Sequence, residues 1–231
     1  MKLVIANKNY SSWSLRPWVL MKMLGVPFEE EQVAFAGTDN LAAFREFSPG
    51  GTVPCLIDGP RTIWDSLGIT LFLADRHEKV WPAEVAAKSW AQCVACEMHS
   101  GFAALRRECT MSIGVRVAPK EPSAELRRDI ERIAEIFEQG LERFGGPFLA
   151  GAQFSGADAF FAPVVFRIRT YGLTVGPLGT QWVERMLELA PMREWEESAL
   201  AETYREASHE EELAAAGTLT ADYRTHSWSR S

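Results

Sequence analysis

The sequence YSSWSLR, at residues 10–16, joins a short apolar run to a helical pattern. The run from residue 3 to residue 6 has the length of a buried strand. Apolar residues then recur at helical spacing, and Ser14 can cap that helix, with Pro17 in its first turn. Gly25 is a typical helix end. The stretch therefore predicts a strand, a serine-rich loop and a helix start.

A helix start of this kind suits an anion or a thiolate. Its first N–H groups are unpaired and its dipole is positive there, so a bound thiol has its pKa lowered. A hydroxyl from Ser11 or Ser12 can donate a hydrogen bond to such a sulfur. Taken alone, the serines are equally explained as helix caps.

Two further segments carry polar chemistry. Pro54, in TVPCL at residues 52–56, opens an apolar strand, which indicates an edge, a turn or a cis bond. A cis bond would turn the backbone of Val53 outward, free to pair with an extended peptide. Asp65 and Ser66 join a strand to a third helix, where the serine and the helix start could hold a carboxylate and the aspartate an ammonium group. An ordinary loop proline and plain capping are the alternatives for these segments.

The pattern of the chain changes near residue 80. The first 78 residues predict the order β-α-β-α-β-β-α, with a strand over 28–35, a short helix over 41–47 and a hairpin around Gly59-Pro60. From residue 84 the pattern is helical almost throughout, with about five helices. One of them opens on SGAD at residues 155–158, which has the form of a capping box. The tail from about Gly217 is polar and predicted to be loose.

The three segments together resemble the layout of glutathione transferases. A serine-bearing helix start, a strand-opening proline about forty residues later and an acid–serine pair a dozen further on are arranged as in that family. SSWSLR at residues 11–16 is similar to the zeta-class signature, and EMHSGF at residues 97–102 resembles proteobacterial members. Trp13 departs from the zeta signature, which has cysteine there. The resemblance implies a thioredoxin-like α/β domain over residues 1–79 and an all-helical domain over 85–216.

The same resemblance implies a site for glutathione as co-substrate. Ser11 or Ser12 would contact the thiolate, with Ser11 slightly favoured because the zeta match covers more of its neighbours. Val53 would pair with the cysteinyl backbone beside a cis Pro54, and Asp65 and Ser66 would hold the γ-glutamyl end. The helical domain would supply the electrophile site, and the family implies a homodimer.

Three residues are candidates for the electrophile site: Trp13, His99 and Arg106. Trp13 adds bulk beside the thiol. Arg106 and Arg107 lie after His99 and could clamp a carboxylated substrate, although a solvated helix face explains them as well.

The resemblance implies a serine-type transferase that adds glutathione, as a thiolate, to a small electrophile. A maleylacetoacetate isomerase-like enzyme would use the same thiolate for cis–trans isomerisation. A non-catalytic ligand-binding module of the same fold is the third alternative. It is disfavoured because a scaffold needs none of the three segments for chemistry.

Composition limits the partners and the cellular location that can be expected. The chain has 231 residues and a net charge of −7, without a long basic run, so neither nucleic acid nor an anionic membrane surface is an expected partner. No apolar run approaches the ~18 residues of a membrane span. Four cysteines make no disulfide scaffold, which favours a cytoplasmic protein, and Cys93 and Cys96 are predicted as buried core residues rather than a metal site. The histidines show no metal-binding spacing.

Overall fold

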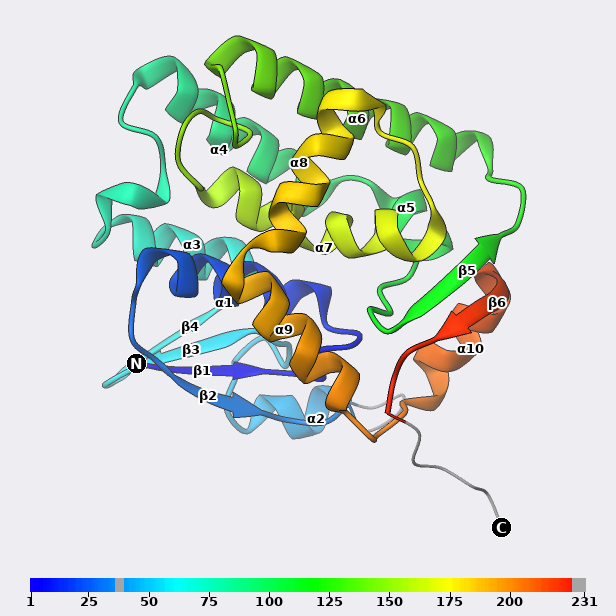
Figure 1. The fold of residues 1–231 in the computed structure, drawn as a ribbon. Helices are drawn as coiled ribbons and strands as arrows, with labels where there is room; N and C mark the ends of the chain where they lie inside the picture. Colours follow the sequence, from blue (N-terminus) through cyan, green and yellow to red (C-terminus); the bar gives the residue numbers. More distant parts are fainter. Residues whose placement is uncertain (36–39, 226–231) are drawn as a thin grey trace.

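The computed structural model describes residues 1–35 and 40–225. A small sheet with its helices occupies one side of the molecule and a helical layer the other (Figure 1). The N-terminal elements are β1 (Lys2–Ile5), α1 (Ser12–Leu24), β2 (Glu29–Gln32), α2 (Asn40–Arg45), β3 (Cys55–Asp58), β4 (Arg61–Trp64) and α3 (Ser66–Ala74), with a 3-10 turn at Glu78–Val80.

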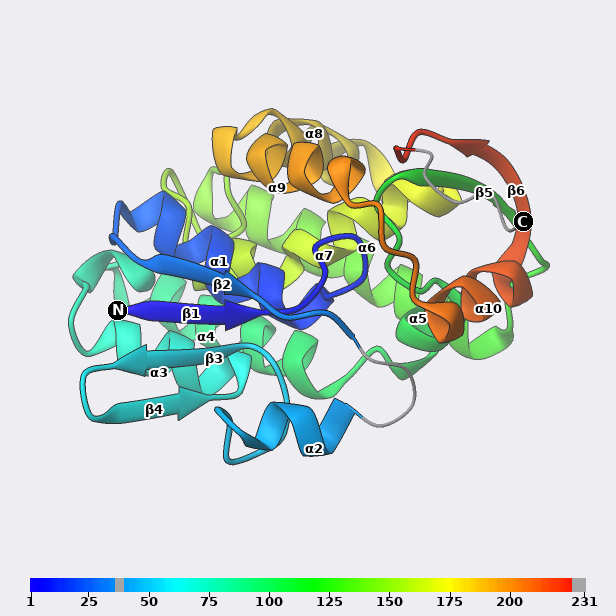
Figure 2. The same ribbon diagram turned by 90° about the horizontal axis from the view of Figure 1, so that it is seen from below.

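The four strands form one mixed sheet in the order β2-β1-β3-β4. β1 runs parallel to β2 and antiparallel to β3, and β3 and β4 form the predicted hairpin. α1 and α3 pack against each other, and α2 lies at the opposite side of the sheet (Figure 2). The predicted element order and the thioredoxin-like fold are therefore confirmed.

The second part of the chain is mainly helical. The described residues form seven helices there rather than the predicted five or so. Helices end and restart at residues 101–102 and 202–206, where no proline in the sequence indicates an interruption. Its elements are α4 (Val85–Ser100), α5 (Ala103–Glu108), β5 (Val115–Pro119), α6 (Ala124–Phe144), α7 (Gly156–Tyr171), α8 (Gly176–Glu188), α9 (Ala190–Ala201), α10 (Ala207–Ala216) and β6 (Gly217–Asp222).

The central helix of this part is α7, which is buried along nearly its whole length. Most of its residues are apolar, as expected of a helix surrounded by other elements, and Asp158 and Arg167 are buried polar exceptions. It packs on α1, α4 and α8, so it joins the helical layer to the sheet domain. Trp18 of α1 and Trp195 of α9 meet edge to face at 5.1 Å and extend the same core.

Two expectations about the second part are wrong. The tail is not loose from Gly217: β6 pairs antiparallel with β5 up to Asp222, while the further residues 226–231 lie outside the described part. Pairing with the distant strand β5 satisfies the backbone hydrogen-bonding groups of β6, although the sequence of β6 is polar. Cys93 and Cys96 are exposed on the outer face of α4, because Val94 and Ala95 occupy the buried face instead.

Candidate active site

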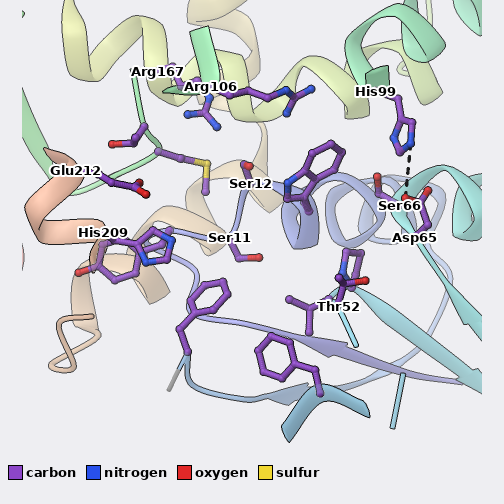
Figure 3. A pocket seen from close by; sticks show the side chains of 18 residues that line it. Ser11, Ser12, Thr52, Asp65, Ser66, His99, Arg106, Arg167, His209 and Glu212 are labelled. Carbon is purple, nitrogen blue, oxygen red and sulfur yellow. Dashed lines mark ion pairs between the residues drawn. The ribbon is translucent and has the colours of Figure 1, made fainter. Parts of the chain in front are cut away.

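A pocket of about 500 Å³ opens between the sheet domain and the helical layer (Figure 3). All of the predicted site residues line it. Clefts of this size, lined by apolar walls with a few convergent polar groups, are typical small-molecule sites. The lining residues are Tyr10, Ser11, Ser12, Trp13, Phe35, Phe44, Thr52, Val53, Pro54, Asp65, Ser66, His99, Arg106, Thr110, Met111, Arg167, His209 and Glu212.

The loop that presents the serines is held from two sides. Glu202, just after α9, accepts hydrogen bonds from the N–H of Lys8 at 2.6 Å and of Asn9 at 3.3 Å. The Asn9 side chain in turn accepts from the N–H of Ile113 at 2.9 Å and of Gly114 at 3.2 Å. The polar residues that follow β1 therefore connect the serine loop to the helical layer, and the start of α1 is placed rigidly.

Ser11 and Ser12 have different local roles. Ser11 is the N-cap of α1, and its hydroxyl accepts from the N–H of Ser14 at 3.4 Å and donates to the Ser14 hydroxyl at 2.7 Å. The expectation that Ser14 caps this helix is wrong, because the helix begins two residues earlier. The Ser12 hydroxyl has no hydrogen-bond partner among the described residues, although the residue is only 7% exposed.

The bond between Val53 and Pro54 is cis, as predicted. Both residues line the pocket, just before β3 begins at Cys55. Among the described residues, neither the N–H nor the C=O of Val53 has a hydrogen-bond partner. A backbone donor and acceptor therefore remain available at the edge of the pocket.

The residue that caps α3 is Asp65 and not Ser66. Asp65, at φ 68°, is the N-cap of α3 and accepts from the N–H groups of Leu67 at 2.7 Å and Gly68 at 3.3 Å. Its second oxygen faces the His99 imidazole at 3.6 Å (Figure 3). The Ser66 hydroxyl is buried and has no hydrogen-bond partner in the described part of the chain, which is costly unless a ligand supplies one.

Three guanidinium groups gather behind the helical wall of the pocket. Arg106 of α5 and Arg167 of α7 line it, and Arg16 of α1 is fully buried and stacks on Trp13. Burial lowers the pKa of Arg16, and repulsion by Arg106 and Arg167 lowers it further. Burial likewise lowers the pKa of Arg167, to about 10, with repulsion by Arg106 second. Within the described residues none of the three forms an ion pair, so this wall favours an anion.

The other predicted electrophile residues lie beside this cluster. Trp13 meets His99 edge to face at 5.5 Å, and Arg106 stacks on the same indole at 4.5 Å. Burial is the main cause that lowers the pKa of His99. Arg107 does not enter the pocket, because its side chain is 64% exposed and pairs with Glu108 at 2.9 Å. Of the adjacent arginines, only Arg106 faces the site.

One wall of the pocket was not predicted from the sequence. Helix α10 brings His209 and Glu212 to the pocket, where His209 stacks on Tyr10 at a centroid distance of 4.7 Å. The available signal was an acid three residues before a histidine, Glu206 and His209, at a helix start. This pair could not be placed near residue 10 from the sequence, because no local sequence pattern indicates that the two segments meet.

The described part of the chain contains neither a candidate metal site nor a candidate membrane-spanning helix. Residues 1–35 and 40–225 contain no group of three or more His, Cys, Asp or Glu side chains that could hold a metal ion. No helix in the same ranges is long and apolar enough to cross a membrane.

Comparison with protein-family models decides the family. Residues 10–76 match the N-terminal domain of glutathione S-transferases, and residues 120–197 match the C-terminal domain. The two matches together cover more than half of the chain. The chain belongs to the glutathione S-transferase family. The predicted enzyme class is thereby confirmed at the level of the family.

Individual relatives agree with this assignment. A zeta-class glutathione S-transferase from Euphorbia esula is 27% identical over 168 residues, which cover 71% of this chain and 75% of the relative. Theta-1 of Mus musculus is 23% identical over 164 residues, or 64% of this chain and 67% of the relative.

Solved structures show the same fold. A Burkholderia glutathione transferase homologue with bound glutathione is 19% identical, with a TM-score of 0.65, and the match covers 86% of this chain and 97% of that chain. Maleylacetoacetate isomerase from Methylobacterium extorquens AM1, with bound malonate and glutathione, is 21% identical with a TM-score of 0.65, over 86% and 97% of the two chains.

Proposed function

We propose that this chain binds glutathione in the pocket, holds its sulfur as a thiolate and adds it to a small electrophile. The observation that carries the proposal is the convergence on one cavity of three groups without a hydrogen-bond partner among the described residues: the Ser12 hydroxyl at the start of α1, the backbone of Val53 and the buried hydroxyl of Ser66. A thiol tripeptide with an amino-acid head needs those three features. Relatives that bind glutathione support the same ligand.

In this proposal the tripeptide spans the sheet-domain side of the pocket. Ser66 and the start of α3 hold the γ-glutamyl carboxylate, and the outer oxygen of Asp65 accepts from the ammonium group. Val53 pairs with the cysteinyl backbone beside Pro54, so that the sulfur meets the start of α1 at Ser11 and Ser12. The helix dipole and one serine hydroxyl stabilise the thiolate electrostatically, without a general base.

The helical wall then selects the second substrate. Arg106 and Arg167 face the pocket without ion-pair partners among the described residues, so an electrophile that bears a carboxylate fits there. Trp13 and His99 form the adjoining surface. An anionic electrophile is also compatible with a glutathione-dependent cis–trans isomerase, which a structural neighbour with bound malonate supports as the second candidate.

We further propose that the enzyme is of the serine type, lies in the cytoplasm and forms a homodimer. Its two domains are proposed to span residues 1–79 and 85–216. The boundaries accord with the end of the α/β elements at α3 and the start of the helical layer at α4. A binding role without catalysis is disfavoured, because it leaves the serine loop and the arginine cluster without a purpose.

Calorimetric titration with reduced glutathione tests the binding site. The Ser66→Ala variant should lose about tenfold or more in affinity, since a hydrogen bond to a charged group contributes about 1.5–3 kcal/mol. Ser198→Ala is the matched control, because that hydroxyl is exposed and donates to a carbonyl within α9. Equal affinities in all three proteins would remove the γ-glutamyl pocket from the proposal.

A further inference from the structure

Glu206 and His209 form a carboxylate–imidazole pair at the start of α10. Glu206 Oε2 lies 2.6 Å from His209 Nδ1, and the same carboxylate is the N-cap of the helix. The Glu206 side chain is only 2% exposed. Burial alone would raise its pKa, but hydrogen bonds from Ser208 and His209 outweigh burial and lower the pKa to about 2. The carboxylate is therefore ionised at neutral pH.

An ionised carboxylate determines which ring nitrogen carries the proton. It can only accept, so His209 Nδ1 must donate to it, which leaves Nε2 on the far side of the ring. Nε2 has no hydrogen-bond partner among residues 1–35 and 40–225, and the His209 side chain keeps 26% exposure. The ring lines the same pocket as the serine loop (Figure 3). The pair thus presents one ring nitrogen without a hydrogen-bond partner among the described residues to the pocket.

The position of the ring is set by packing against two aromatic rings. His209 stacks on Tyr10 at 4.7 Å and meets Phe35 in a tilted arrangement at 4.9 Å, both between ring centroids. Tyr10 immediately precedes Ser11, so the imidazole borders the place where the sulfur is proposed to lie. The Tyr10 hydroxyl also donates to Glu210 at 2.6 Å, which anchors α10 to the serine loop.

The wall that carries His209 is braced from behind. Arg224, after β6, binds Glu210 at 2.6 Å and Asp222 at 2.7 Å, and its side chain is only 4% exposed. Besides its partner Glu206, the charged or titratable groups around the ring are therefore Glu210 and Glu212 on α10, Tyr10 on the serine loop and Arg224 after β6, with Arg167 opposite. A tail held this firmly can place a catalytic group.

We propose that His209, oriented by Glu206, is an acid–base catalyst that protonates the carbon next to the site of attack when the electrophile is an activated alkene. The inference rests on the proposed transferase function and assigns a substrate class to it. His209 is the catalytic residue, and Glu206 is a positioning residue that acts through it.

The step balances without any further reagent. The glutathione sulfur forms a bond to the β-carbon of an alkene conjugated to a carbonyl, and the π pair moves toward the carbonyl as an enolate. The imidazolium Nε2 then gives its proton to the α-carbon. The proton released when the thiol ionised restores the imidazolium, so the net reaction is addition of S–H across the double bond. An aryl chloride needs no such proton, because chloride leaves with the electron pair.

The test compares two neutral electrophiles, 4-phenylbut-3-en-2-one and 1-chloro-2,4-dinitrobenzene, each with glutathione. His209→Phe retains a ring between Tyr10 and Phe35 but has no nitrogen. We expect its kcat with the enone to fall about 100-fold or more, the size of a lost acid–base catalyst, while kcat with the aryl chloride stays within about threefold. In His209→Ala, added imidazole should restore part of the enone rate.

The positioning role of Glu206 has its own pair of variants. Glu206→Gln should lower kcat with the enone and leave its KM and the aryl chloride rate nearly unchanged. Glu211→Gln, at an exposed position on the same helix, is the control and should match the wild type in both reactions.

Several results would overturn the inference. Equal losses with both electrophiles in His209→Phe would mean that the ring only packs, and an unchanged enone rate would mean that it takes no part. A wild-type enzyme that uses the aryl chloride but not the enone would refute the alkene assignment alone. A wild-type enzyme that binds glutathione but uses neither compound would refute the inference, whereas a wild-type protein that does not bind glutathione would refute the proposed function as well.

Discussion

At the scale of single residues, Ser11 and Ser12 divide two tasks that the sequence could not separate. Ser11 caps α1, and its hydroxyl shares one hydrogen with Ser14 across 2.7 Å. If Ser14 becomes the donor of that bond, the Ser11 hydrogen is free to turn toward an arriving thiolate. The Ser12 hydroxyl is free from the outset among the described residues. The structure therefore strengthens the case for Ser12, against the slight preference for Ser11 that the family signature suggests.

The thiolate contact can be assigned by spectroscopic titration of bound glutathione. Removing the true donor should raise the thiol pKa by about one to two units, because a hydrogen bond to a charged atom contributes about 1.5–3 kcal/mol. We expect this rise in Ser12→Ala and a smaller one in Ser11→Ala, which should instead lose about 1 kcal/mol of folding stability with its cap. Unchanged thiol pKa values in both variants would leave the helix start alone responsible for the activation.

A second prediction for a single residue concerns the contribution of Glu206 to folding stability at acid pH. Its pKa is lowered in the folded chain to about 2 from a model-compound value of 4.5. A lowered acid pKa stabilises the fold above the unfolded pKa and loses that contribution as the pH falls toward the folded value. Between about pH 4.5 and about pH 2, the wild type should therefore lose stability more steeply than Glu206→Gln. Urea unfolding across that window measures the difference, and parallel slopes would contradict it.

At the scale of elements, α7 shows how a local signal becomes a tertiary anchor. The predicted capping box is present, with Asp158 accepting from the N–H of Ser155 at 3.0 Å. The same buried carboxylate also accepts from the N–H of Leu149 at 2.9 Å and from Trp182 Nε1 at 3.0 Å. The cap therefore ties the loop before α7 and helix α8 to the central helix, which no local pattern indicates.

Replacing that carboxylate should be costly. Asp158→Asn exchanges an acceptor for an amide whose NH₂ meets donors, and we expect a loss of about 2–4 kcal/mol in the free energy of unfolding. Ser123→Ala, which removes the cap of α6, is the comparison and should lose about 1 kcal/mol. Urea denaturation of the two variants measures both. Losses of equal size would mean that Asp158 acts only as a local cap.

At the scale of the whole molecule, the predicted homodimer has a candidate surface. Trp64 on β4, Leu71 on α3 and Val85 at the start of α4 are large apolar side chains with exposures of 45%, 51% and 76%. Exposed large apolar side chains are enriched at association surfaces, which makes these three residues candidates for the dimer contact.

Light scattering at micromolar concentrations should return twice the chain mass, and Leu71→Glu should shift it toward the monomer, because a charge buried in an interface is unpaired. Leu219→Glu provides the control, since Leu219 is 49% exposed on β6 in the C-terminal ribbon. A monomer mass for the wild type would refute the dimer, and a shift caused by Leu219→Glu would place the contact elsewhere.

Local signals were sufficient for much of the fold. Strands, turns and helix starts depend on neighbours within a few residues, so the β-α-β-α-β-β-α order and the box at residues 155–158 could be predicted. The cis bond before Pro54 needed the family resemblance as well, because the local pattern left an edge, a turn and a cis bond open. The polar tail was misjudged because β6 is stabilised by pairing with β5, about a hundred residues earlier. The prediction that Cys93 and Cys96 are buried was wrong, because periodicity alone did not identify the inner face of α4.

The sequence by itself determined the family fold and the sheet-domain side of the pocket, because those residues sit at helix starts and strand ends that short segments encode. On the opposite side, the sequence proposed Trp13, His99 and Arg106, but only the tertiary structure decided which other groups join them. Arg16, Arg106 and Arg167 come from three different helices, and His209 reaches Tyr10 across some two hundred residues of chain. Such contacts depend on how buried helices pack and on where their hydrogen-bonded anchors lie, and no spacing along the chain records either.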